Sequence, residues 1–351
     1  MFSTDFYSQL YFADGSLDEP NLMVDVKSKP ADFIVDELME IELTGEGEHI
    51  WLNISKAAMH TNQVVKAISK LSHVHQKNIG ISGMKDFRAK TTQWFSVWMP
   101  GVKEADLPDW TMLNSDSMKI NRIVRHSRKL KRGTHIGNRF NIVLRNFEGE
   151  FDHFEKRIES IKHQGVPNYF GEQRFGINGS NLNQAYDFLS SNKKVKQRQK
   201  RSMLLSSARS WLFNSVLSER LRQQSWLSVQ QGEPLIFNHS RQFFICDDVV
   251  ECQERVDGLD VHTTAPLWGI GENKIFPQSS TLQSFEYQII SQFDIFQQGL
   301  IQSGLDYSRR ALRFVPSDLS WNRVEQDIEL TFILGRGLFA TSLLRELVKS
   351  R

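Results

Sequence analysis

Residues 81–94 read Ile-Ser-Gly-Met-Lys-Asp-Phe-Arg-Ala-Lys-Thr-Thr-Gln-Trp. From residue 92 to 99 the chain is rich in aromatic and β-branched residues, with Trp94 and Phe95 on opposite faces. Apolar residues on both faces predict a strand inside a covered sheet. Asp86 then lies on the loop that enters this strand, where a rigid element can hold a reactive group. On local grounds alone, an Asp after a Gly-x-Lys turn is more often a turn former or a helix N-cap.

The residues before this loop predict two strands and a helix. Alternation around Phe33 predicts a strand over residues 31–43, and a second strand passes through residues 51–54 after a Gly-rich turn. Apolar residues at three- and four-residue spacing predict a helix over residues 55–71, with Ser55 as its N-cap. The loop that carries Asp86 therefore lies between this helix and the strand that contains Trp94.

Alternation of apolar residues also marks two later strands. Over residues 139–145 the pattern places Asn138 and Phe140 side by side on one face. Residues 328–334 alternate in the same way, and a helix is predicted over residues 340–349. The region between, from about residue 150 to 310, is mostly helical in pattern. This order predicts one domain built from both ends of the chain, with a second domain inserted.

Composition describes an ordinary globular protein. At 351 residues the chain exceeds one typical domain, and 40% hydrophobic with 24% charged residues fit a folded protein. No apolar run approaches the ~20 residues that span a bilayer. The N-terminus lacks the pattern of a signal peptide. Cys246 and Cys252 do not form a Cys-x-x-Cys motif, so we expect a reduced, cytoplasmic protein.

Charge is strongly segregated although the formal net charge is only +2. Residues 119–145 carry nine Lys or Arg and residues 193–209 carry seven, and neither run contains an acid. A single basic run is more often a solvated helix face or a mobile loop. Two long acid-free runs instead favour binding to a nucleic-acid backbone. The expected backbone contacts are Lys85, Arg125, Arg128, Lys129, Lys131, Arg132, Lys193, Lys194 and Lys196.

Several fragments, taken in order, resemble the tRNA pseudouridine synthase D (TruD) family. The loop at Asp86 matches its Gly-x-Lys-Asp-x-x-Ala-x-Thr-x-Gln pattern, and the fragments occur along most of the chain. They are residues 45–49 with Lys56, 83–93, 137–140, 168–176, 309–313 and 339–347. His60, Ile136 and Arg139 depart from residues common in the family, but they lie beside the matching positions.

The resemblance implies an α+β fold. A pseudouridine-synthase catalytic domain with a mixed, largely antiparallel sheet flanked by helices would comprise residues 1–153 and 311–351. A family-specific α+β domain would occupy residues 154–310, and the two would form a V-shaped molecule. We expect Tyr169, Phe170, Arg174 and Phe175 to hold the junction between the domains.

The same resemblance implies an isomerase that converts a uridine in tRNA, usually uridine 13 of the D arm, to pseudouridine. Asp86 would be the essential group, with Phe33, Asn138, Phe140 and Phe339 at the flipped base. The reaction would need no cofactor and no metal, and no membrane is involved. The chain holds 24 Phe residues. Without the motif match, Phe33, Phe140 and Phe339 would each be interpreted as an ordinary core residue. We expect a monomer.

Two alternatives remain open from the sequence. One is a non-catalytic RNA-binding or folding protein of the same shape, and the other is the same enzyme acting on a different RNA. His73 and His75 resemble a metal pair, but an exposed helix end explains them better because no Cys or acidic cluster accompanies them. Gly335-Arg336-Gly337 is better explained as a turn than as a nucleotide-binding loop.

Overall fold

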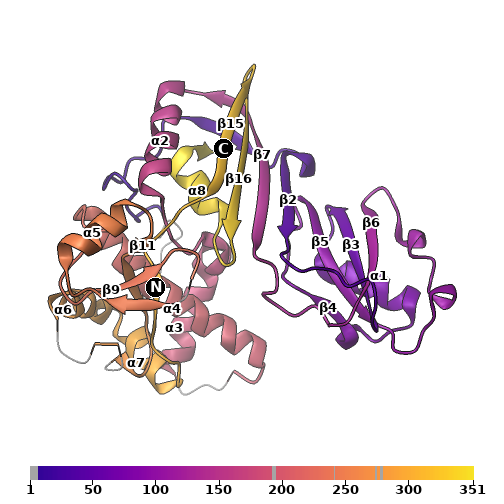
Figure 1. The fold of residues 1–351 in the computed structure, drawn as a ribbon. Coiled ribbons are helices and arrows are strands. Elements are labelled where there is room, and N and C mark those ends of the chain that lie inside the picture. Colours follow the sequence, from indigo (N-terminus) through magenta and orange to yellow (C-terminus); the bar gives the residue numbers. More distant parts are fainter. Residues whose placement is uncertain (1–6, 192–194, 241, 273–274, 277–279) are drawn as a thin grey trace. The chain divides into compact units, whose positions relative to one another are not determined.

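The computed structural model describes residues 7–191, 195–240, 242–272, 275–276 and 280–351 (Figure 1). The chain divides into two compact units, each assembled from separate segments. The strand unit, as we call it, comprises residues 22–150, 316–338 and 350–351. The helical unit comprises residues 1–21, 151–315 and 339–349.

One mixed sheet forms the strand unit. Its order is β15-β16-β7-β2-β5-β3-β6, with β1 also paired to β7 and β4 to β5. Strands β2 and β5 run parallel, whereas the other pairs named here are antiparallel. The bounds are β1 (Met23–Val26), β2 (Phe33–Leu38), β3 (His49–Ala57), β4 (Ile79–Ile81), β5 (Lys90–Trp98), β6 (Met118–His126), β7 (Gly137–Glu148), β15 (Ser317–Val324) and β16 (Asp327–Gly335). The predicted mixed, largely antiparallel sheet with strands from both ends of the chain is confirmed.

The helix predicted over residues 55–71 begins later than expected. Strand β3 continues to Ala57, and helix α1 (Thr61–Ser72) follows with His60 as its N-cap. Ser55 therefore lies in the strand, and its prediction as N-cap was wrong. Buried and less buried residues still alternate at the end of β3, as they do along a strand. This alternation continues through residues that the sequence analysis had included in the helix. Val64 and Ile68 of α1 pack in the core of this unit.

Strands β7 and β16 place the predicted polar and aromatic residues on one face. Phe140 lies opposite Phe332 of β16, and Asn138 lies opposite Glu37 of β2. Because directly opposite residues in an antiparallel pair share a face, these four side chains project from the same side of the sheet. The prediction that Asn138 and Phe140 share a surface is confirmed.

Helices dominate the helical unit. They are α2 (Phe151–Gln164), α3 (Ser180–Ser190), α4 (Arg198–Arg222), α5 (Val249–Asp257), α6 (Thr281–Ile290), α7 (Asp294–Gln302) and α8 (Ala340–Leu347). Short strands pair between them: β9 (Pro234–Phe237), β10 (Phe243–Ile245), β11 (Val261–His262), β12 (Thr264–Leu267), β13 (Ser308–Ala311), β14 (Arg313–Phe314) and β8 (Val166–Pro167). Helix α4 is buried along most of its length, so it is the core element of this unit.

The predicted domain boundaries, residues 1–153 with 311–351 and residues 154–310, stay a prediction, as does the V shape. The compact units also divide the chain near residue 150, but residues 1–21 and 339–349 group with the middle of the chain.

Candidate active site

Asp86 lies on the loop that joins β4 to β5, as the sequence predicted. One carboxylate oxygen, Oδ1, accepts a hydrogen bond from the backbone N–H of Arg88 at 3.0 Å. The other, Oδ2, accepts from the ammonium of Lys27. The Asp86 side chain is 43% exposed and that of Lys27 is 23% exposed. The carboxylate is therefore fixed in direction and still open to a ligand.

The surroundings of Asp86 favour its ionised form. Partial burial acts to raise the pKa of the carboxyl. The hydrogen bond and charge of Lys27, with the backbone N–H groups of Arg88 and Phe87, outweigh burial and hold the pKa below its ordinary value. Asp86 is thus a carboxylate at neutral pH.

Lys27 also contacts an aromatic ring. Its Nζ lies 4.2 Å from the centroid of Phe33, within the range of a cation–π interaction. Its backbone lies in the left-handed region, with φ of 61°, which is uncommon for a residue other than Gly, Asn or Asp. One lysine thus joins the carboxylate of Asp86 to the ring of Phe33, and it does so from a backbone conformation that costs free energy.

Phe33 belongs to an aromatic row on the sheet. The centroids of Phe33 and Phe140 are 6.1 Å apart in an edge-to-face arrangement, and Phe140 stacks on Phe332 at 5.1 Å. Beside them, the Oδ1 of Asn138 is buried and has no hydrogen-bond partner in the described part of the chain. A buried amide oxygen without a partner costs free energy unless a ligand supplies a donor.

Lys56 holds the backbone of the loop that carries Asp86. Its Nζ donates to the backbone carbonyls of Met59 at 2.6 Å and Asp86 at 3.3 Å. The residue is 1% exposed. Burial lowers the pKa of Lys56 to about 8, although the charge of Asp86 acts to raise it and that of Lys85 to lower it further.

Lys85, next to Asp86 in sequence, points elsewhere. Its ammonium forms an ion pair with Glu37 at 2.9 Å, and the two side chains are 6% and 0% exposed. The other carboxylate oxygen of Glu37 accepts from the backbone N–H of Trp94 at 3.1 Å. The backbone N–H of Lys85 donates to the Oγ1 of Thr61 at 3.1 Å. Lys85 therefore ties the loop to β2, β5 and α1, and its ammonium is not available to a phosphate.

Comparison with known proteins decides the family. The family model described as tRNA pseudouridine synthase D (TruD) matches residues 15–184 and 180–347. The chain belongs to the TruD family. A tRNA pseudouridine synthase D from Methylococcus capsulatus is 44% identical over 326 residues, which cover 92% of this chain and 90% of that protein. One from Nitrosococcus oceani is 39% identical over 338 residues, covering 95% and 93%.

A solved structure agrees with the fold of this TruD chain. A Methanosarcina mazei protein described as a tRNA pseudouridine synthase D superposes with a TM-score of 0.74. The match covers 97% of both chains at 18% sequence identity. At that identity it supports the fold and nothing further.

Phe339, the remaining residue that the TruD resemblance assigns to the base, belongs to the helical unit. It is the N-cap of α8, half-buried, and its ring centroid lies 6.2 Å from that of Phe170. Its place at the flipped base stays a prediction.

The predicted backbone contacts differ in their surroundings. The residues on the surface are Arg128, Lys131, Arg132 and Lys196. Arg125 is 18% exposed and bonds Glu104 at 2.8 Å and the carbonyl of Val102 at 2.7 Å, so it holds loops together. Lys129 donates to the carbonyl of Lys77 at 2.6 Å. Lys193 and Lys194 lie outside the described residues.

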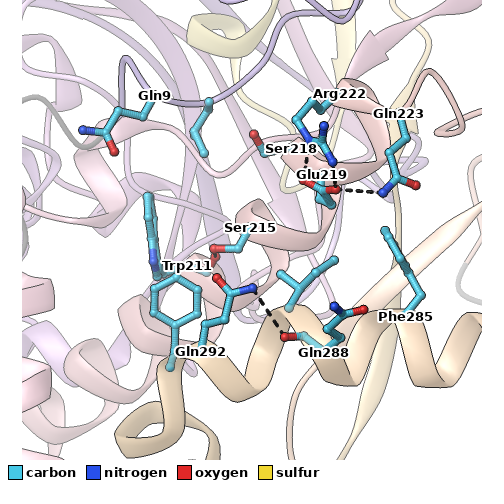
Figure 2. Close-up of a pocket in the computed structure, with 13 residues that line it drawn as sticks. Gln9, Trp211, Ser215, Ser218, Glu219, Arg222, Gln223, Phe285, Gln288 and Gln292 are labelled. Atoms are coloured by element: carbon cyan, nitrogen blue, oxygen red, sulfur yellow. Dashed lines mark hydrogen bonds and ion pairs between the residues drawn. The ribbon is translucent and has the colours of Figure 1, made fainter.

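A separate hollow of about 430 Å³ lies in the helical unit (Figure 2). Helices α4 and α6 contribute most of its lining. Arg222 and Gln223 both point at the carboxylate of Glu219, at 2.5 and 2.7 Å, as Figure 2 shows. Since Arg222 already forms an ion pair with this carboxylate and none of the predicted site residues lines the hollow, we do not assign it to the reaction.

The histidines that resemble a metal pair in sequence both follow the end of α1. His73 is its C-cap, with φ of 56°, and the Nδ1 of His75 accepts the backbone N–H of Lys77 at 3.1 Å. Within the described ranges, the chain has no helix that is both long and apolar enough to cross a membrane.

Sequence reasoning missed Lys27 and Glu37. Lys27 is 59 residues from Asp86, and Glu37 is 48 residues from Lys85. The sequence predicted only that a basic partner from elsewhere was as plausible for Asp86 as Lys85. No local signal marks Lys27, because its position depends on a positive φ that its residue type does not favour.

Proposed function

We propose that this chain converts a uridine in tRNA, uridine 13 of the D arm, to pseudouridine, with Asp86 as the essential catalytic group. Membership of the TruD family supports the reaction class. The observation that carries the residue assignment is the accessible carboxylate of Asp86, which Lys27 holds ionised beside the ring of Phe33.

The reaction breaks the bond between N1 of uracil and C1′ of ribose and forms a bond between C5 and C1′. C5 loses a proton and N1 gains one, so the product is an isomer and no redox cofactor is needed. An ionised carboxylate can add to C6 or C1′, or stabilise an oxocarbenium-like sugar. A glycal route starts from the same ionised group.

The target uridine leaves its stack to reach Asp86. Unstacking costs a few kcal/mol, and an aromatic contact offsets roughly 1–3 kcal/mol of it. Phe33 is the candidate for this contact, with Phe140 packed behind it. The unsatisfied Oδ1 of Asn138 can accept the N3–H of uracil.

Backbone contacts are proposed for the surface residues of the basic runs, Arg128, Lys131, Arg132 and Lys196. Their charges attract phosphates, so affinity for tRNA should fall steeply with salt. The cytoplasm as location and a monomeric state stay predictions.

The test is Asp86→Asn, assayed for pseudouridine in a tRNA transcript. We expect kcat to fall by at least about 10⁴-fold, while tRNA binding is retained. The matched control is Asp106→Asn, which removes an exposed carboxylate in the same unit and should leave kcat unchanged. A transcript with cytidine at position 13 should remain unmodified.

The runner-up is a binding protein that performs no chemistry. Wild-type protein that binds tRNA but leaves every uridine unchanged would establish it. Mapping pseudouridine across total RNA from cells that lack the protein distinguishes position 13 of tRNA from another RNA target.

A further inference from the structure

Two exposed aromatic rings lie next to each other on the loop side of the strand unit. Phe87, which directly follows Asp86 in the chain, is 40% exposed. Its ring centroid is 4.6 Å from that of His60, and the two ring planes are inclined by 30°. His60 is exposed as well. The two rings therefore form a tilted stack at the surface, within the range of a favourable aromatic contact.

The exposure of Phe87 is unusual for its residue type. Two residues further on, Ala89 is completely buried, so the small side chain lies in the interior and the large aromatic one at the surface. Met84, on the other side of Asp86 in sequence, is 55% exposed. Large apolar side chains are ordinarily buried, and packing in this unit does not account for two of them beside a reactive carboxylate.

A buried lysine holds the two ring-bearing segments together. The ammonium of Lys56 donates to the backbone carbonyls of Met59 at 2.6 Å and Asp86 at 3.3 Å. These are the residues immediately before His60 and Phe87. The stack is thus positioned by the fold before a ligand arrives, which reduces the conformational entropy that binding would cost.

Phe87 is linked directly to the carboxylate of Asp86. Its backbone N–H is one of the groups that stabilise this carboxylate as an anion. Consecutive Cα atoms are about 3.8 Å apart, and consecutive nucleotides of one strand in a duplex rise by about 3.4 Å. When Asp86 engages the target uridine, the side chain of Phe87 is therefore within reach of the adjacent nucleotide.

Base flipping creates a requirement that this stack can meet. A uridine that leaves its place in the RNA takes a stacking partner away from the neighbouring base. An aromatic side chain can replace that partner, because every base has a π face. Arg88 and Lys90, which follow Phe87 closely in sequence, are exposed and add positive charge for the nearby phosphates.

We propose that Phe87, supported by His60, stacks on the base next to the target uridine in the RNA chain. The proposal rests on the proposed function, since it takes the flipped uridine at Asp86 as the substrate. It divides the aromatic contacts between two bases: Phe33 binds the flipped base, and Phe87 binds the base that stays in the strand. His60 is a positioning residue, because it acts by holding the ring of Phe87.

The first test compares two substitutions that each remove one exposed ring, Phe87→Leu and Trp98→Leu. Trp98 is also 40% exposed, but it lies at the other end of β5, roughly 26 Å from Lys90. Phe87→Leu should raise the Kd for tRNA about 10-fold and leave kcat near the wild-type value, because the Asp86 carboxylate and its backbone donors remain. Phe87→Tyr, which keeps a ring, and Trp98→Leu should bind as the wild type does.

The second test locates the base by a double-mutant cycle. Two tRNAs carry an abasic nucleotide, one on the 5′ side and one on the 3′ side of the target uridine, and binding is measured with Asp86→Asn protein so that no turnover occurs. One abasic tRNA should bind about 10-fold more weakly when Phe87 is present and show no further loss with Phe87→Leu. Equal losses with and without the Phe87 ring, for both RNAs, would reflect tRNA structure alone and overturn the proposal.

Failure of this proposal is separable from failure of the proposed function. Wild-type protein that forms pseudouridine, together with a Phe87→Leu variant that binds like Trp98→Leu, would overturn the stacking site alone. Wild-type protein that modifies no tRNA would overturn the function. If urea denaturation shows that Phe87→Leu is unfolded, His60→Ala decides, since the Gln63 side chain accepts the backbone N–H of His60 at 2.8 Å in either case. It should bind tRNA about 3-fold more weakly, and wild-type affinity would contradict the proposal.

Discussion

Two consecutive residues of one loop form ion pairs in opposite environments. Asp86 pairs with Lys27, and the two side chains are 43% and 23% exposed. Lys85 pairs with Glu37, and these side chains are 6% and 0% exposed. Adjacent side chains in an extended segment point apart. Two neighbouring residues can therefore supply one accessible carboxylate, that of Asp86, and one buried ion pair, that of Lys85.

The difference in burial gives the two ion pairs different roles: the Asp86–Lys27 pair is open to a substrate, and the Lys85–Glu37 pair stabilises the loop. An exposed pair contributes about 0–1 kcal/mol to stability, so Asp86 and Lys27 can be rearranged by a substrate at little cost. A buried pair is expensive to break, because the remaining charge is left without a partner. The loop can therefore present a reactive group while its backbone stays fixed by Lys85 and Lys56.

The largest effect on stability is expected from Glu37→Gln. It leaves Lys85 charged and buried, so the free energy of unfolding should fall by about 3–5 kcal/mol. Asp86→Asn should change the same quantity by at most about 1 kcal/mol. Urea denaturation at neutral pH measures both. Equal losses in the two variants would contradict the distinction between the pairs.

A double variant sharpens this comparison. Replacing both Glu37 and Lys85 by Met removes the charges together and fills a similar volume. Its stability should exceed that of Glu37→Gln, because apolar replacement of a buried pair is often neutral, but it should stay about 1–3 kcal/mol below the wild-type value, because the buried N–H of Trp94 loses its acceptor. Catalysis should still be impaired, since the Glu37 carboxylate no longer accepts the N–H of Trp94.

Lys56 predicts a specific dependence of stability on pH. Its pKa is about 8 in the folded protein against 10.5 for an ordinary lysine, so between these values the unfolded chain binds the additional proton. Stability should therefore rise with pH across this window, by an amount on the order of 3 kcal/mol. Denaturation at pH 7.5 and 10 measures it, and Lys56→Met should lack this component. An identical rise in both proteins would rule it out.

Lys27→Met should give the smallest effect. Removing the hydrogen bond and charge of Lys27 raises the pKa of Asp86, so the acid limb of the pH profile of kcat/KM moves to higher pH. We expect about a 10-fold loss near pH 7.5 and a larger loss near pH 5. The control is Lys29→Met, an exposed lysine two residues away. A loss that is independent of pH would show that Lys27 only positions the loop.

The strands were largely predictable from periodicity. Residues 328–334 alternate, and β16 buries Ile328, Leu330, Phe332 and Leu334. The start of α1 was not predictable, because strand and helix spacings overlap between residues 55 and 60. Local pattern identifies elements better than it fixes their ends.

The candidate site was predictable only through the motif. Asp86 and Phe33 were named from the resemblance, whereas their link through Lys27 depends on a contact 59 residues apart in sequence and a positive φ. The orientation of Lys85 was foreseen in part, since neighbours in an extended segment point apart. The pairing of Lys85 with Glu37 could not be predicted, because it depends on the register of β2 beside β5.

The pairing of β7 with β16 has a consequence for synthesis on the ribosome. Phe140 stacks on Phe332, yet residues 151–315 are translated between these strands. Until β16 emerges, one edge of β7 lacks its neighbour, and an open apolar edge invites association with other chains. A nascent chain released after residue 150 should therefore aggregate, and the aromatic row beside Asp86 is complete only when translation is nearly finished.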